Sequence, residues 1–350
     1  MRAQFLTGFG GPEMLRYHDD APDPAPGPGE LRVRVGAAAL NNTDIWTREG
    51  RYGSPADAEA TAGWRREPVA FPRIQGADVV GRVDQVGHGV DAGRVGQRVI
   101  VDPMLYDGDE RALADTTRLH YLGSERDGGF ADYVTVPAGN AISVDSPLSD
   151  AELATFPTAY ATALRMLNRA AVTGGETVLI TGASGGVGSA LIQLARARGA
   201  RPVAMVGAGK REQATELGAE AVLDRDCPDI AGALDAAGVG PADVVADVVA
   251  GPILGGLLNA LRPFGRYVTA GAIAGPLVTA DLRTVYLRQL TLVGSSFATH
   301  EEFADLVALI TAGRLRPLLA GRYPLPELRR AQQDFAGKRF FGKLVIDMGL

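Results

Sequence analysis

Two kinds of hydrophobic pattern divide the chain. Up to about residue 149, short runs of alternating apolar and polar residues are separated by turns rich in Gly and Pro, which predicts a β-rich region. Further along, short apolar runs alternate with helical segments, which predicts a parallel sheet covered on both faces. The predicted strands are residues 31–35, 79–86 and 98–101 in the first region, and 177–181, 202–206, 221–223, 244–247, 267–270 and 291–293 in the second.

The same patterns predict the main helices and the domain limits. Helical stretches are expected at residues 151–169, 190–198, 301–312 and 325–334. The apolar run 342–346 is expected to return as a strand to the first region. We therefore predict an α/β protein with a β-rich domain at 1–155, a doubly wound parallel-sheet domain at 156–297, and a return to the first domain at 298–350.

A glycine-rich turn follows the predicted strand 177–181 and leads into the helix at 190–198. Glycines at this point let the backbone turn sharply and let a diphosphate approach the N–H groups of the helix N-terminus. The strand–turn–helix context makes this a dinucleotide-binding motif. The loop residues expected to hold the cofactor are Ala183, Ser184, Gly185, Gly186, Val187 and Gly188.

The end of the next strand bears on the choice between NADH and NADPH. An NAD enzyme carries an acidic residue there, but this chain has Gly207 followed by Lys210 and Arg211, and Arg225 comes after the third strand. Because a 2′-phosphate is bound by cations, the sequence favours NADPH. The alternative is that Lys210 and Arg211 are only the solvated first turn of the following helix.

Composition excludes several classes of partner. The formal net charge of −6 and the absence of a basic run argue against a nucleic-acid ligand. No apolar run is long enough for a membrane span or a signal peptide, and Cys227 is the only cysteine. We therefore expect a cytoplasmic protein that acts on a small-molecule substrate, without a membrane or nucleic-acid partner.

Taken together, the motifs resemble the medium-chain dehydrogenase/reductase superfamily, and within it the zinc-free quinone oxidoreductase-like or alcohol dehydrogenase-like branch. The landmarks are residues 41–44 (NNTD), 76–81 (GADVVG), 96–99 (GQRV), 128–134 (GGFADYV), 182–188, 243–247 (DVVAD) and 342–343 (GK). The resemblance implies a GroES-like catalytic domain and a Rossmann domain, with the active site in the cleft between them. It also implies a homo-oligomer, a dimer or a tetramer, with residues 272–278 and 290–293 as candidate interface elements.

The resemblance also indicates that no catalytic metal is bound. Zinc enzymes of the superfamily use Cys, His and Cys, and the matching positions here are Asn41, Ala77 and Thr158. Zinc needs three or four N, S or O ligands in tetrahedral geometry, which these residues do not offer. Trp46 also falls where the zinc enzymes often place a relay histidine.

Without a metal, the sequence favours reduction of an acceptor that is already polarised. We expect hydride transfer from NADPH to a quinone or an α,β-unsaturated carbonyl, with hydrogen-bond donors stabilising the carbonyl oxygen. The candidate catalytic residues are Asn41, Thr43, Asp44 and Tyr52. Residues expected to line the nicotinamide site are Thr162, Val249, Gly271, Ala272, Ser296 and Phe297.

Other interpretations remain open for the residues and for the whole chain. Asn41 and Asp44 are also typical caps of a short helix, and Tyr52 is also explained as an ordinary loop aromatic. Ser184 lies in a G-x-S-x-G sequence and, with Asp247 and His300, has the residue order of a hydrolase triad. The remaining alternatives are a non-catalytic NADPH-binding protein and a zinc-free alcohol or carbonyl dehydrogenase that tailors a secondary metabolite.

Overall fold

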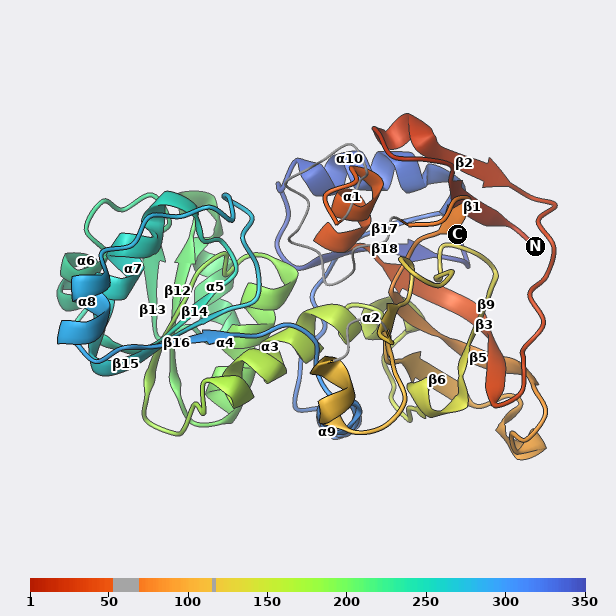
Figure 1. Ribbon diagram of the computed structural model, residues 1–350, viewed down its shortest axis with the longest axis horizontal. Helices are drawn as coiled ribbons and strands as arrows, with labels where there is room; N and C mark the ends of the chain where they lie inside the picture. Colours follow the sequence, from red (N-terminus) through yellow and green to blue (C-terminus); the bar gives the residue numbers. More distant parts are fainter. Residues whose placement is uncertain (53–68, 115–117) are drawn as a thin grey trace. The chain divides into compact units, whose positions relative to one another are not determined.

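The computed structural model describes residues 1–52, 69–114 and 118–350 (Figure 1). The chain forms two compact units. The β-rich unit comprises Met1–Thr158, Thr299–Gly313 and Pro317–Leu350, and the parallel-sheet unit comprises Ala159–Ala298 and Arg314–Arg316. None of the helices in the described ranges has the length and apolar character needed to cross a membrane.

A six-stranded parallel sheet forms the centre of the parallel-sheet unit, in the order β13-β12-β11-β14-β15-β16. The strands are β11 (Thr177–Ile180), β12 (Arg201–Val206), β13 (Ala221–Asp224), β14 (Ala242–Asp247), β15 (Leu261–Thr269) and β16 (Thr291–Gly294). The order reverses between β11 and β14, and in open sheets of this kind ligands bind outside the carboxyl ends of the strands at such a point.

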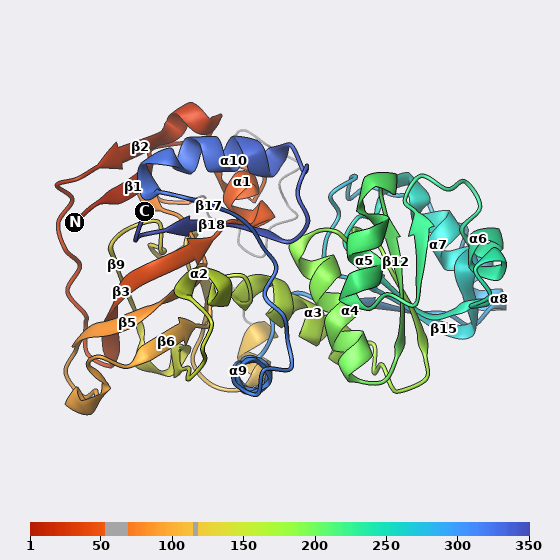
Figure 2. The same cartoon turned by 180° about the vertical axis from the view of Figure 1, so that it is seen from behind.

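Helices cover this sheet on both faces (Figures 1 and 2). They are α3 (Pro157–Arg169), α4 (Gly186–Ala197), α5 (Arg211–Leu217), α6 (Ile230–Ala236), α7 (Leu254–Ala260) and α8 (Leu282–Leu287). Leu179, Val203 and Val245 pack with α6 and α7 in one buried cluster. Because successive strand side chains point to opposite faces, their neighbours face the other side, where α4 packs on β11 and β12.

The β-rich unit is organised around the long strand β3 (Glu30–Ala39), which is paired along both edges. The strands β5 (Asp78–Val86), β6 (Arg98–Val101) and β10 (Ala141–Ser143) continue the sheet on one side. On the other side lie β9 (Tyr133–Pro137), β18 (Lys343–Asp347) and β17 (Leu319–Tyr323). Smaller sheets are formed by β1 (Ala3–Leu6), β2 (Leu15–His18) and β4 (Arg73–Ile74), and by β7 (Met104–Leu105) and β8 (His120–Tyr121).

Short helices complete this unit. The α-helices are α1 (Asn42–Arg48), α2 (Asp150–Leu153), α9 (His300–Thr311) and α10 (Leu328–Ala336). The 3-10 turns of the two units are η1 (Pro12–Met14), η2 (Ala92–Arg94), η3 (Glu110–Ala114), η4 (Ala138–Asn140), η5 (Ala208–Lys210), η6 (Gly251–Ile253) and η7 (Leu325–Glu327). In both views α1 lies beside β18 and near α10 (Figures 1 and 2).

Two predictions about the elements can be compared directly with the structure. The expected return of residues 342–346 is confirmed, because β18 pairs antiparallel with β3. The single helix expected at 151–169 is wrong, because the structure has α2 and α3 with a break between them. Pro157 explains the break: it has no N–H to donate to the preceding turn, so it is tolerated at the start of a helix and not inside one.

Candidate functional site

The ends of three strands meet in the β-rich unit. Ala39, the last residue of β3, pairs with Asp78 at the start of β5 and with Val345 near the start of β18. Because β3 runs antiparallel to both neighbours, its carboxyl end lies beside their amino ends. This register brings Asn41, Asp78 and Lys343 together, although they are far apart in the sequence.

Lys343 is the centre of this cluster. Its Nζ donates to Asn41 Oδ1 at 2.5 Å and to Asp78 Oδ2 at 2.9 Å. The second carboxylate oxygen of Asp78 accepts the backbone N–H of Thr158, at the start of α3, at 2.8 Å. Lys343 is 3% exposed and Asp78 is 0% exposed, so this is a buried ion pair whose partners satisfy each other's hydrogen-bonding groups.

Asp44 holds the first turn of α1. Its Oδ2 accepts the backbone N–H of Asn41 at 2.7 Å, while Gln75 Nε2 donates to the Asp44 backbone carbonyl at 2.8 Å. Burial raises the pKa of Asp44 to about 7, and the negative charge of Asp78 adds to this rise. The hydrogen bond from the Asn41 N–H and the charge of Lys343 lower the pKa and offset part of the rise. The capping interpretation therefore describes both residues, because Asn41 is the N-cap of α1 and forms a capping box with Asp44; the side-chain oxygen of Asn41 also accepts from Lys343.

Two polar groups of the same segment are buried without hydrogen-bond partners in the part of the chain that the structure describes. They are Asn41 Nδ2 and Thr43 Oγ1. Unpaired buried polar groups are uncommon in folded proteins and call for an explanation, such as strain or an absent ligand. Both residues are catalytic candidates from the sequence, and both lie in the segment that holds Asp44.

Two tyrosines extend the cluster. Tyr52 is half-buried, with its ring 5.8 Å from that of Trp46, and burial and the charge of Asp44 raise the pKa of its phenol. Tyr121, which the sequence did not single out, is fully buried, and its hydroxyl shares a hydrogen bond of 2.7 Å with Thr158 Oγ1. Burial, reinforced by the charge of Asp78, raises the pKa of Tyr121. Both phenols therefore keep their protons at neutral pH.

The residues at the zinc-ligand positions do not fit a zinc ion. The Asn41 oxygen is bound to an ammonium group, Ala77 has no ligand atom, and the Thr158 hydroxyl is paired with Tyr121. In the described ranges, no three His, Cys, Asp or Glu side chains are grouped so that they could hold a metal. Zinc prefers thiolate, imidazole and carboxylate ligands, so we derive no metal-dependent step from this donor set.

In the parallel-sheet unit, the glycine-rich turn follows β11 and leads into α4. Gly182 has φ +56°, in the region that favours glycine, and a Cβ on Gly188 would lie 2.3 Å from the Gly182 carbonyl oxygen. The turn is therefore closed so tightly that only glycine fits at position 188. Gly185 is the N-cap of α4, so the backbone N–H groups of Gly186 and Val187 lie at the helix terminus, where a diphosphate is bound in this type of turn. Ala183 and Ser184 complete the turn.

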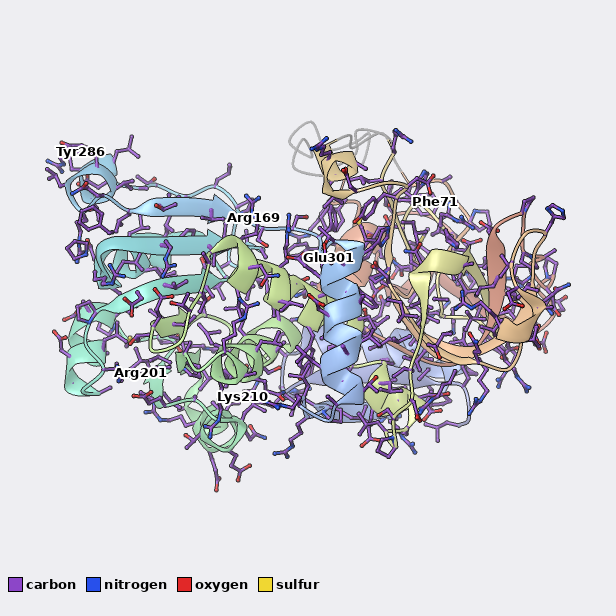
Figure 3. All side chains as sticks on the ribbon, turned by 90° about the horizontal axis from the view of Figure 1, so that it is seen from below. Phe71, Arg169, Arg201, Lys210, Tyr286 and Glu301 are labelled. Carbon is purple, nitrogen blue, oxygen red and sulfur yellow. The ribbon has the colours of Figure 1, made fainter. Side chains whose placement is uncertain are left out.

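One cation lies close to this turn and a second lies at the end of β12. Lys210 Nζ is 3.4 Å from Ser184 Oγ, and the Arg225 guanidinium lies against Gly207 at the end of β12. Burial, together with the positive charge of Arg225, lowers the pKa of Lys210. Arg211, at the start of α5, donates instead to the backbone carbonyl of Val222 at 2.6 Å. Lys210 is labelled in Figure 3.

The other residues predicted to bind cofactor lie in the same unit. The loops after β14, β15 and β16 lie at the edge of the sheet where β11 ends, because all these strands are parallel. The N–H of Ala274 donates to the carbonyl of Val249 at 2.8 Å, which ties the first two loops together. The predicted residues on these loops are Val249, Gly271, Ala272, Ser296 and Phe297, and Thr162 lies on α3.

The hydrolase interpretation is wrong. Asp247 is fully buried and accepts from the hydroxyls of Thr181 and Tyr267 within its own unit. His300 belongs to the β-rich unit, where its Nδ1 lies 2.7 Å from Asp102 Oδ2 and its Nε2 lies 3.1 Å from the carbonyl oxygen of Tyr106. Both ring nitrogens thus have other partners, so His300 does not form a triad with Asp247.

Two family models match the chain. The alcohol dehydrogenase GroES-like domain covers residues 27–146, and the zinc-binding dehydrogenase domain covers residues 186–312. Acryloyl-coenzyme A reductase from Metallosphaera sedula is 31% identical over 93% of this chain and 94% of its own length. Quinone oxidoreductase from Rattus norvegicus is 28% identical over 99% of this chain and 97% of its own length.

Solved structures match over the whole length as well. A crystal structure of a protein from Sinorhizobium meliloti 1021 is 53% identical with a TM-score of 0.93, and the match covers 99% of this chain and 96% of that one. A structure of an NAD-dependent alcohol dehydrogenase is 34% identical with a TM-score of 0.90 over 100% of both chains. These similarities establish a GroES-like domain and a Rossmann domain in this chain.

Proposed function

The chain belongs to the medium-chain dehydrogenase/reductase superfamily, and from this premise we propose that it is a zinc-independent, NADPH-dependent reductase of quinones or α,β-unsaturated carbonyl compounds. Its membership makes it an oxidoreductase that uses a nicotinamide cofactor. The narrower proposal concerns the substrate class, the cofactor and the absence of zinc. It is supported by relatives that are named quinone oxidoreductase and acryloyl-coenzyme A reductase.

One observation carries the proposal. At the position where zinc enzymes place a metal ligand, this chain has an amide whose oxygen is bound to Lys343 and whose Nδ2 is buried without a partner among the described residues. That nitrogen is a hydrogen-bond donor, and a carbonyl oxygen that gains negative charge during reduction is the acceptor it suits. In the proposed reaction, Asn41 thus donates a hydrogen bond to the substrate oxygen, in place of the Lewis acid that a zinc enzyme uses.

The residues around Asn41 support the same chemistry. A reduced nicotinamide supplies the hydride, which in the proposed reaction adds to the β-carbon of an enone or to a quinone. Asn41 Nδ2 donates to the oxygen that becomes negative, and the protonated phenol of Tyr52 is a second donor from the same cluster. The proton that completes the reduction comes from solvent, so no dedicated acid is required in this unit.

The preference for NADPH rests on charge at the end of β12. No acidic residue occupies residues 206–209, and the cations Lys210 and Arg225 lie beside Gly207 and Ser184. A 2′-phosphate carries negative charge that both cations stabilise, whereas a ribose 2′-hydroxyl gains nothing comparable from them. Burial lowers the pKa of Lys210, and the positive charge of Arg225 adds to this effect, as expected for two cations held near each other.

Initial rates test the cofactor and the substrate class together. We expect the enzyme to oxidise NADPH, and NADH much more slowly, with 1,4-benzoquinone or 2-cyclohexenone as acceptor. Replacing Lys210 and Arg225 by Ala together raises KM for NADPH about 10-fold or more and leaves KM for NADH within about 2-fold. Arg211→Ala is the matched control, because this cation is bound to the Val222 carbonyl. Oxidation of simple alcohols with NAD⁺, with no reduction of either acceptor, would overturn the proposal.

We also propose a homodimer that forms through the edge strand β16. Among the described strands it pairs with β15 alone, and exposed large apolar side chains are concentrated between residues 264 and 292. Among them, Leu282 is 69% exposed, Leu292 is 48% exposed, and Tyr286 lies at the margin of its unit (Figure 3). A second copy can pair its own β16 by two-fold symmetry and cover these side chains. Light scattering after size-exclusion chromatography tests this: Leu292→Asp should give a monomer, and an unchanged dimer would exclude this interface.

A further inference from the structure

The orientation of the Asn41 amide is set by a residue from the other end of the chain. Lys343 Nζ lies 2.5 Å from one end of the amide. An ammonium group only donates hydrogen bonds, so the atom facing it must be the amide oxygen. The amide nitrogen therefore points away from Lys343, and this is the buried Nδ2 without a partner in the described ranges. Asn41 itself is 7% exposed.

The Lys343 ammonium group is in turn fixed by its hydrogen bond to Asp78. Asp78 Oδ2 accepts from it at 2.9 Å, and Asp78 Oδ1 accepts the N–H of Thr158 at 2.8 Å. The ammonium thus has a fixed carboxylate on one side and the Asn41 oxygen on the other. A buried ion pair is weak support for stability, because removing two charges from water offsets much of their attraction. The pair lies where it fixes a hydrogen-bond donor that has no partner among the described residues.

We propose that Lys343 is the positioning residue that turns the Asn41 amide nitrogen toward the carbonyl oxygen of the substrate. The proposal rests on the function proposed above and adds a residue to it. Without Lys343, the amide can rotate by half a turn and present its oxygen instead. An oxygen at that place repels the negative charge that develops during reduction, so catalysis weakens although Asn41 is still present.

A kinetic cycle separates positioning from a merely structural role. Lys343→Met leaves the Asp78 charge unpaired and is open to misfolding, so it is combined with Asp78→Asn, which keeps an acceptor for Thr158. We expect Asn41→Ala to lower kcat by roughly 10- to 100-fold. The Lys343→Met/Asp78→Asn variant should lower kcat about 10-fold relative to the wild type, with KM for NADPH unchanged. When the same two substitutions are added to Asn41→Ala, kcat should fall by less than about 2-fold relative to Asn41→Ala alone. Independent, multiplying effects on kcat would overturn the proposal.

The chain offers a matched control. Lys338 Nζ donates to Asn42 Oδ1 at 2.8 Å, so the next asparagine has the same Lys–Asn bond at an exposed position. Lys338→Met removes that bond without touching Asp78 or Asn41. Its kcat should equal that of the wild type, and an equal loss in both Lys variants would show that position 343 has no special role.

A second readout needs no turnover. The chain has five asparagines, so ¹⁵N labelling of asparagine gives five side-chain amide signals, and the Asn41 signal is identified by its loss in Asn41→Ala. We expect a sharp, slowly exchanging pair of Asn41 amide protons in the wild type, and broad, faster-exchanging signals in Lys343→Met/Asp78→Asn. Unchanged signals would overturn the positioning role whatever the enzyme reduces. A fixed amide in an enzyme that reduces neither 1,4-benzoquinone nor 2-cyclohexenone would instead refute the proposed function.

Discussion

Asp44 should make the stability of the β-rich unit depend on pH. Its carboxyl is 4% exposed, and burial with the neighbouring charge of Asp78 raises its pKa from 3.8 to about 7. The folded state then holds a proton that the unfolded chain has released, so stability falls as pH rises between these two values. Over the whole interval between the two pKa values, the free energy of unfolding falls by roughly 4 kcal/mol. Roughly 2.5 kcal/mol of this is lost between pH 5 and pH 8.

Asp44→Asn removes this ionisation and keeps an oxygen that accepts the Asn41 N–H. Urea unfolding at pH 5 and pH 8, followed by tryptophan fluorescence, measures the effect, since Trp46 lies on the same helix as Asp44. Relative to Asp44→Asn, the wild type should lose roughly 2.5 kcal/mol between the two pH values. Any change in the free energy of unfolding that the substitution causes equally at both pH values cancels in this difference.

The control for this experiment is Asp19→Asn, at an exposed position. It should follow the wild type at both pH values. A difference between wild type and Asp44→Asn that is constant with pH would refute the reasoning. So would a wild type that gains stability toward pH 8, because that sign requires a carboxyl whose pKa is lowered in the folded state.

Two further predictions come from other parts of the molecule. Gly188→Ala places a Cβ 2.3 Å from the Gly182 carbonyl oxygen, so the turn must open; titration followed by NADPH fluorescence should show binding weakened by about 10-fold or more. Burial alone lowers the pKa of His300, but the bonds to Asp102 and to the Tyr106 carbonyl outweigh it and raise the pKa. The protonation of His300 therefore contributes stability below pH 6.5, and this contribution is lost as pH rises through the raised pKa, while burial raises the pKa of Asp102 and offsets part of it. Asp102→Asn should lower the pKa of His300 in an NMR titration, and an unchanged value would show that the carboxylate is not its cause.

The motif-bearing segments could be predicted from the sequence because their function is local. The turn at 182–188 joins one strand to the next helix, so its glycines, its strand and its helix are neighbours along the chain. The same holds for Asn41, Thr43 and Asp44, which lie within or next to one short helix. In each case the residues that form the feature lie within one element and its flanking turn.

The partners of these residues could not be predicted in the same way. Lys343 meets Asn41 only because β18 and β5 both pair with β3 in a particular register, and no local pattern encodes that register. Tyr121 lies in a segment without a motif and reaches Thr158 through tertiary packing. A lysine at the start of an apolar strand was the available signal for Lys343, since a buried ammonium needs a nearby carboxylate.

In the proposed function, the cluster around Lys343 accounts for the choice of an activated acceptor. A zinc ion binds the substrate oxygen directly and stabilises both an alkoxide and a polarised carbonyl. Here the positive charge of Lys343 is neutralised by Asp78 and is linked to the amide of Asn41, so the donors that we propose for the substrate, the Asn41 amide and the Tyr52 phenol, are both neutral. A neutral donor stabilises a developing oxyanion less than a metal does, and it does not ionise an alcohol. Quinones and enones need the least help at the oxygen, because their conjugation spreads the negative charge, and for this reason we propose them as the acceptors.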